Sequence, residues 1–214
     1  MRKLCLLLTL IFLFGCSVSK EPSTLDPGSD QTLRENLNQI VDQQLSREHF
    51  SFSIILEDHE YRFVGEQKGT DWTLRSEGAE EPIKVKKRGD KIELIQREKK
   101  EKLSERQFGL LSPRDHLILL QESAGRVKGF PVRDQGVQGM EIILDREKIG
   151  QIVKQQMGDQ KTAQEIANRA SRNIQVRYQL WYRTGDKELT RMEIHLDSVN
   201  PYPETQIRYI FRNP

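Results

Sequence analysis

The sequence predicts an α+β fold in which a strongly curved antiparallel sheet, left unclosed as a half barrel, wraps around helices. Three observations support this prediction. Much of the chain beyond residue 50 alternates apolar and polar residues with a period of two, which is typical of strands with one solvated face. Turn-like residues separate these runs at short intervals. The remaining apolar stripes have helical spacing and supply the surface that the apolar face of such a sheet needs as a cover.

Residues 1–15 predict a lipoprotein signal peptide. Arg2 and Lys3 precede an apolar run of about a dozen residues, well short of the roughly 20 that a helix needs to cross a bilayer. The run ends in Leu13-Phe14-Gly15-Cys16, which resembles the lipobox of bacterial lipoproteins, where the cysteine receives acyl chains such as palmitate and becomes the new N-terminus. We therefore expect lipidation of Cys16 and a lipid anchor on the extracytoplasmic face of the cell membrane. The alternative is an ordinary secretory signal with a chance cysteine.

The composition of the processed chain excludes two classes of protein. Of the two cysteines, Cys5 leaves with the signal and Cys16 carries lipid, so the fold depends on a hydrophobic core and has no disulfide. The whole chain has a net charge of +2, and loss of Arg2 and Lys3 brings the side chains to about zero. A general affinity for nucleic acid is therefore not supported.

Residues 16–31 predict a flexible tether, because Ser, Pro, Asp and Gly dominate them. We expect one domain over residues 32–214. Its first element is a helix: Thr32 and Glu35 fit a capping box, and the apolar stripe that follows is Leu33, Leu37, Ile40, Val41 and Leu45.

Five short strands with apolar residues mostly on one face are expected next. Their alternating apolar residues are Phe50, Phe52 and Ile54, then Tyr61 and Phe63, Trp72 and Leu74, Ile83 and Val85, and Ile92 and Leu94. The charged segment 97–107 is expected at an exposed strand end or in a loop.

The second half of the domain begins with a short helix capped by Ser112, with Pro113 at its first position. Strands are expected over 126–134 and 137–144, followed by a helix capped by Asp145 and a further helix over 162–170. A hairpin with its turn at 184–187 and a final strand close the chain; their alternating apolar residues are Ile174, Val176, Tyr178, Leu180, Tyr182, Met192, Ile194, Leu196, Ile207, Tyr209 and Phe211.

No enzymatic motif is present in the sequence. It lacks H-E-x-x-H, G-x-S-x-G, P-loop and C-x-x-C patterns, and its four histidines have no metal-ligand spacing. We therefore expect a protein that is not an enzyme and that uses neither a metal nor a cofactor.

Two groups of residues are candidates for binding. Lys84, Lys86, Lys87 and Arg88 belong to a basic cluster that would suit anionic wall polymers or phospholipid head groups, or would protect a solvated edge strand from aggregation. Aromatic residues gather on the alternating apolar face, where they would form either a packed core or the lining of a ligand site. These candidate lining residues are Phe52, Phe63, Tyr178, Tyr182, Tyr209 and Phe211.

The order of the lipobox, tether, amphipathic helix, antiparallel strands, Pro-capped helix, two strands, helix and closing strands resembles the lipoprotein-carrier superfamily. This superfamily includes the periplasmic lipoprotein carriers, the mycobacterial lipid-binding lipoproteins and lipoproteins of sporulation and germination. The resemblance implies an open half barrel whose concave side is plugged by helices. It also implies one of two roles: binding of an acyl chain or a lipidated client in that concavity, or docking of a protein partner such as a cell-wall enzyme or a sporulation or germination factor.

Overall fold

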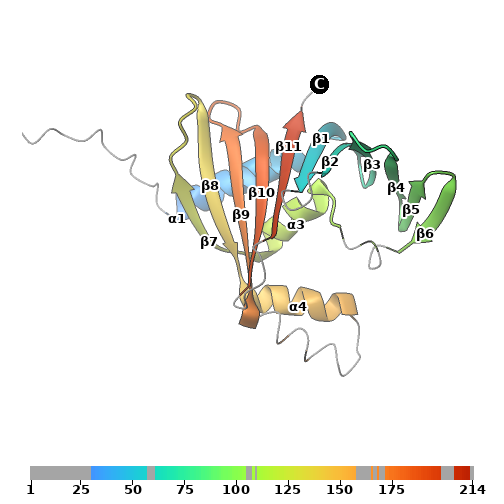
Figure 1. Ribbon diagram of the computed structural model, residues 1–214. Helices are drawn as coiled ribbons and strands as arrows, with labels where there is room; N and C mark the ends of the chain where they lie inside the picture. Colours follow the sequence, from blue (N-terminus) through green and yellow to red (C-terminus); the bar gives the residue numbers. More distant parts are fainter. Residues whose placement is uncertain are drawn as a thin grey trace, which may run out of the picture.

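The computed structural model describes residues 30–56, 61–104, 108, 110–157, 165, 168, 172–198 and 205–212. Within these residues an eleven-stranded antiparallel sheet forms (Figure 1). Its strands are β1 (His49–Leu56), β2 (Tyr61–Lys68), β3 (Asp71–Glu77), β4 (Ile83–Arg88), β5 (Lys91–Gln96), β6 (Lys99–Leu103), β7 (Ala124–Phe130), β8 (Val137–Leu144), β9 (Ile174–Arg183), β10 (Leu189–Ser198) and β11 (Thr205–Arg212).

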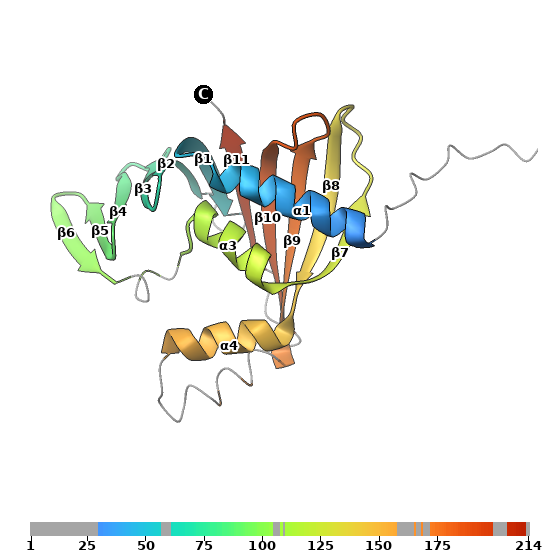
Figure 2. The ribbon, with the colours of Figure 1, turned by 180° about the vertical axis from the view of Figure 1, so that it is seen from behind.

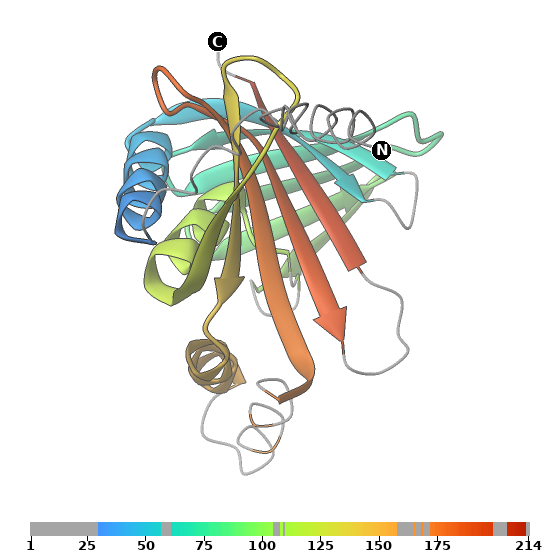
Figure 3. The ribbon, with the colours of Figure 1, turned by 90° about the vertical axis from the view of Figure 1, so that its left-hand side faces the viewer.

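The strand order is β6-β5-β4-β3-β2-β1-β11-β10-β9-β8-β7, so β6 and β7 lie at the two ends and the sheet is not closed. The first and last strands of the chain meet in the middle, where Phe52 is paired with Phe211. Seen from the side of β7, the strands on the two sides of this seam run in clearly different directions, which shows the strong curvature of the sheet (Figure 3). The predicted fold class is confirmed.

Two helices, α1 (Asp30–Leu45) and α3 (Pro113–Ser123), lie together across the concave face of the sheet (Figure 2). Leu37, Ile40 and Val41 form the buried stripe of α1, and Leu117 and Leu120 are fully buried on α3. The two helices are joined by polar contacts, among them the hydrogen bond from Gln121 Nε2 to Asp42 Oδ1 at 2.6 Å. A third helix, α4 (Arg146–Met157), follows β8 and lies apart from this pair (Figure 2).

The helix starts follow local side-chain chemistry. Ser112 caps α3 with Pro113 in its first turn, as predicted, and Asp115 completes a reciprocal capping box with Ser112. Asp145 Oδ1 accepts hydrogen bonds from the backbone of Glu147 and Lys148 at the start of α4, also as predicted. The predicted cap at Thr32 is wrong: α1 begins at Asp30, whose carboxylate pairs with Arg34 one turn later and suits the positive end of the helix dipole.

Two strands differ from their predicted limits. The strand expected over 126–134 begins at Ala124 and ends at Phe130, because Pro131 has no N–H to continue the ladder. Part of the charged segment 97–107 forms the edge strand β6, which the absence of an apolar period concealed. Most of the helix expected over 162–170 lies outside the described residues.

The sheet therefore has two regions with different surroundings. The helix-covered half comprises β7–β11 with α1 and α3, and the wing comprises β3–β6, which extends away from these helices (Figure 1). Strands β1 and β2 connect the two regions.

Candidate ligand site on the concave face

The concave face of the helix-covered half is a packed aromatic core that continues onto β1. Phe50 lies between Phe52 and Phe211, with ring centroids 6.2 and 5.9 Å apart, and Phe52 lies 6.3 Å from Tyr209. Of the candidate lining residues, five are buried among protein side chains and Phe63 is partly exposed. The exposed fractions of the five are Phe52 2%, Tyr178 1%, Tyr182 2%, Tyr209 0% and Phe211 7%.

The tyrosine hydroxyls in this core have protein partners. Tyr178 forms a 2.8 Å hydrogen bond with Nδ1 of His116 on α3, and Tyr209 donates to the carbonyl of Leu111 at 3.1 Å. Tyr182 donates to Gln138 Oε1 at 2.9 Å. Because these groups are satisfied by the protein itself, the aromatic residues of this half hold α3 against the sheet.

Burial also fixes the protonation of the same cluster. Desolvation lowers the pKa of His116 to about 4, although the nearby charge of Asp115 acts in the opposite direction. Desolvation likewise raises the pKa of both Tyr178 and Tyr209. All three side chains are therefore neutral at pH 7, which suits an uncharged interior.

The concave face of the wing is apolar but has much less cover from helices. Trp72, Leu74, Val85 and Ile92 are buried there, whereas Ile83, Leu94 and Leu103 are only partly buried. The ring of Phe108 lies 5.6 Å from that of Trp72 and provides one described contact from outside the wing. The partly buried residues Ile83, Leu94 and Leu103 therefore offer apolar surface on this face.

Two buried polar atoms on this face, Trp72 Nε1 and Gln67 Oε1, have no hydrogen-bond partner. Both amide atoms of Gln44, in the last turn of α1, also lack one. Gln67 and Trp72 lie directly opposite each other on β2 and β3. The hydrogen bond from Gly69 N to Glu48 O joins the turn of this hairpin to the segment after α1, whose last turn contains Gln44. A buried polar group without a partner is costly, so this end of the wing is suited to a ligand or water that supplies the missing bonds.

Sequence reasoning did not identify these polar residues as a candidate site. One signal was available, because Gln44 follows Ile40 by four residues and Val41 by three and so lies on the apolar stripe of α1. Gln67 gave no comparable signal, since a single glutamine in a strand is ordinary.

The structure separates the predicted basic cluster onto two faces. Lys84, Lys86 and Arg88 alternate on the outer face of β4, whereas Lys87 lies on the concave face, opposite Trp72 and Ile92. Lys87 therefore belongs to the surroundings of the candidate ligand site, and only the other three can act together on the outer surface.

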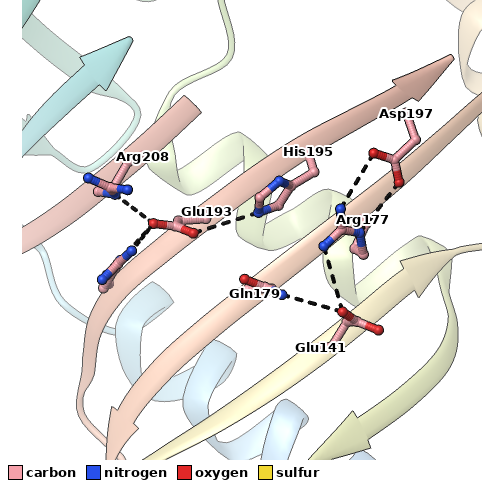
Figure 4. Close-up of polar contacts among 8 residues, drawn as sticks. Glu141, Arg177, Gln179, Glu193, His195, Asp197 and Arg208 are labelled. Carbon is pink, nitrogen blue, oxygen red and sulfur yellow. Dashed lines mark hydrogen bonds and ion pairs between the residues drawn. The ribbon is translucent and has the colours of Figure 1, made fainter. Parts of the chain in front are cut away.

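The outer face of the helix-covered half carries a network of charged residues (Figure 4). Oε1 of Glu193 accepts hydrogen bonds from Arg208 Nε at 2.5 Å and from Arg191 Nε at 2.8 Å. Oε2 of the same carboxylate lies 3.6 Å from His195 Nε2. Burial alone would raise the pKa of Glu193, but the two guanidinium groups lower it below its ordinary value.

A second part of the network ties together three neighbouring strands. Arg177 on β9 contacts Asp197 on β10 at 3.4 Å and Glu141 on β8 at 3.7 Å, and Gln179 donates to Glu141 at 3.4 Å (Figure 4). The carboxylates are matched by cations, so the network stabilises strand pairing. In the described part of the chain, no group of His, Cys, Asp or Glu has the arrangement of a metal site.

No protein-family model and no curated protein matches this sequence. Among solved structures, the Mycobacterium tuberculosis lipoprotein LppX matches over 86% of this chain and 95% of its own, with a TM-score of 0.54 and 11% sequence identity. LprF from Mycobacterium bovis matches over 86% of this chain and 92% of its own, with a TM-score of 0.47 and 8% identity. The likeness to LppX shows that the chain has the fold of a mycobacterial lipoprotein, as the sequence resemblance implied.

Proposed function

We propose that this protein is a membrane-anchored extracytoplasmic lipoprotein that binds a lipid or another acylated ligand on the concave face of the wing. The observation that carries the proposal is the pair of buried, unpartnered polar atoms on Trp72 and Gln67, which lie opposite each other on β3 and β2, on the same face as the partly exposed apolar residues Ile83, Leu94 and Leu103. The helix-covered half acts as the scaffold, because its own aromatic residues fill it.

The chemistry of this surface suits an acyl chain with a polar head. Trp72 Nε1 donates, Gln67 Oε1 accepts, and the amide of Gln44 does both. A protonated carboxyl or an amide group, which both donates and accepts, would satisfy such atoms, while the partly exposed Ile83, Leu94 and Leu103 would contact the methylene groups. Each methylene group removed from water contributes about 0.8 kcal/mol, so a chain along several strands gives substantial affinity.

The anchor rests on Cys16, which lies outside the described residues. None of the described helices is both long enough and apolar enough to span a membrane. We expect the protein to incorporate labelled palmitate in its native host and the Cys16→Ser variant to lose the label and the membrane association. A Cys16→Ser variant that keeps both would contradict lipidation at this position.

The position of the ligand can be tested with the two tryptophans of the chain. Trp72 lies on the concave face of the wing, and Trp181 lies on the outer face of β9, where Arg191 covers its ring at 4.2 Å. Parinaric acid, a fluorescent fatty acid that accepts energy from tryptophan, is added to the Trp181→Phe and Trp72→Phe variants. We expect strong quenching in Trp181→Phe, where Trp72 remains, and weak quenching in Trp72→Phe. Equal quenching, or none, would contradict the site.

A second role, as an adaptor for a protein partner, is favoured by a different observation. Phe130, Trp181 and Arg191 form a continuous group on the outer face, with the two rings 5.3 Å apart. Aromatic and arginine side chains dominate binding at protein interfaces. A cell-wall enzyme or a sporulation or germination factor would be the partner. Crosslinking in the native host should then recover one specific protein, and Trp181→Ala should abolish its recovery; recovery that is unaffected by Trp181→Ala would contradict docking here.

A further inference from the structure

A hollow of about 420 Å³ lies on the outer face of the sheet, across β1–β4 and the end of β11. The pairing of these strands places its residues in two adjacent rows. One row contains Arg212, Ser51, Glu66 and Thr73, and the other contains Ser53, Val64, Arg75 and Lys84. The hollow therefore combines three hydroxyl groups with three cations on a rigid sheet, on the face opposite the proposed acyl site.

Ser53 provides evidence that this hollow is suited to a ligand. The residue is 1% exposed and lines the hollow, yet its Oγ has no hydrogen-bond partner. A buried hydroxyl normally finds a partner within the protein, because leaving it unpaired is costly. The unpaired Oγ can donate to an acceptor that enters from outside.

The charges around the hollow indicate what the acceptor is. Among the described residues, Arg75, Lys84 and Arg212 have no ion-pair partner across the hollow or elsewhere. The one carboxylate in the lining is Glu66, which lies between Ser51 and Thr73. Its side chain is 68% exposed, and its Oε2 lies 4.0 Å from Nε2 of His49, which is further along the strand from Arg75 and Lys84. Three cations against one exposed carboxylate leave the hollow positive.

We infer that this hollow binds a phosphoryl group, with Arg75 and its cross-strand neighbour Lys84 neutralising its charge and the hydroxyl of Ser53 donating to one of its oxygens. A phosphoryl group offers several acceptor oxygens with spread negative charge, which matches guanidinium, ammonium and hydroxyl donors. The source is either a free phosphate monoester or the phosphodiester of a lipid head group or wall polymer. The site is independent of the acyl ligand on the concave face.

The test uses the mature lipidated protein in nonionic detergent and isothermal titration calorimetry with two probes. Inorganic phosphate represents the free monoester, and glycerophosphoglycerol represents the phosphodiester. We expect at least one probe to bind, and Arg75→Gln and Lys84→Gln each to raise its Kd about tenfold, the value of one lost hydrogen bond to a charged group. Tighter binding of inorganic phosphate assigns the monoester, and tighter binding of glycerophosphoglycerol assigns the diester; both support the site.

Matched variants separate this site from diffuse surface charge. Lys100→Gln and Lys102→Gln remove cations from the outer face of β6, beyond the hollow, and should change the Kd less than about twofold. Equal losses for Lys84→Gln and Lys100→Gln, or no binding of either probe, would overturn the proposal.

Ser53→Ala gives a readout that a purely structural role would not produce. Because Oγ has no partner in the free protein, its removal should leave the melting temperature in phosphate-free buffer unchanged or higher. The same variant should bind the probe more weakly and lose the rise in melting temperature that the probe produces. A lower melting temperature without probe, together with unchanged probe affinity, would show that the hydroxyl serves the fold alone.

Discussion

The two regions of the sheet share a sequence pattern and differ in what covers it. In the helix-covered half, the alternating residues Tyr178 and Tyr209 meet α3 and bond to its residues or to the segment before it. In the wing, Trp72 and Ile83 follow the same alternation, but the strands extend away from α1 and α3 (Figure 1), and apolar side chains such as Ile83 stay partly exposed. Alternation in the sequence therefore predicts which residues share a face of the sheet, but not whether other parts of the protein cover that face.

The largest expected effect of a substitution lies in the core of the helix-covered half. Leu120→Ala on α3 removes a side chain that is 0% exposed, and the resulting cavity should lower the free energy of unfolding by about 4 kcal/mol. Ile83→Ala in the wing removes a partly buried side chain and should cost about 1 kcal/mol. Urea unfolding measures both; equal costs would mean that the wing is packed as tightly as the helix-covered half.

Acid should lower the free energy of unfolding of the protein through protonation of His116 in the unfolded chain. Its pKa is about 4 in the folded protein and near 6.5 in the unfolded chain, so between these values the unfolded chain takes up a proton that the folded protein excludes. The contribution of neutral His116 to the free energy of unfolding is complete above pH 6.5 and falls by about 3 kcal/mol as the pH is lowered to 4.

The matched control is His116→Gln, which keeps a polar side chain near Tyr178 and removes the titration. The difference in unfolding free energy between the parent protein and this variant should shrink as the pH falls from 6.5 to 4, because carboxylates titrate in both proteins. A constant difference across that range would show that His116 does not titrate as its burial predicts.

Part of the fold could be predicted from the sequence alone. Local patterns predicted the final hairpin, most strands and the starts of the helices at Ser112 and Asp145, because capping and alternation involve neighbours in the chain. The pairing of β1 with β11 joins the two ends of the domain, and no local signal predicts it. The strand β6 was hidden because an edge strand of lysines and glutamates needs no apolar period.

The candidate site was predicted only in part, for a physical reason. Alternation placed Phe52, Tyr209 and Phe211 on one face, and these residues do come together. Whether helices or a ligand cover such a face depends on how far α1 and α3 reach across it, which their sequences do not specify. The basic cluster was divided for a simpler reason: Lys87 is two residues from Val85 and must share its face.

A smaller effect is expected at the start of α3. Ser112→Ala removes the capping hydroxyl, which accepts from Asp115 N at 3.2 Å, and should lower the free energy of unfolding by about 1 kcal/mol. Thermal unfolding measures this, with Ser112→Asp as the control that restores a cap. Equal losses in Ser112→Ala and Ser112→Asp would show that capping is not the cause.

The smallest effect is expected on the exposed side of the same half. Asp30→Asn breaks the pair with Arg34 in α1, where the two side chains are 66% and 42% exposed, and should change the free energy of unfolding by about 0.5 kcal/mol or less. The same urea unfolding experiment measures it. A cost above that of Ser112→Ala would mean that surface charge, rather than packing, distinguishes the helix-covered half.

Photo-crosslinking with a diazirine fatty acid, followed by peptide mass spectrometry, tests most directly whether an acyl chain binds to the wing and not to the helix-covered half. We predict that the crosslinked residues lie on the concave face of β3–β5, around Trp72, Leu74 and Leu94. Crosslinks confined to the concave face of β8–β11, around Tyr178 and Leu180, would contradict the account, because they would require an acyl chain to occupy the region that α1 and α3 fill.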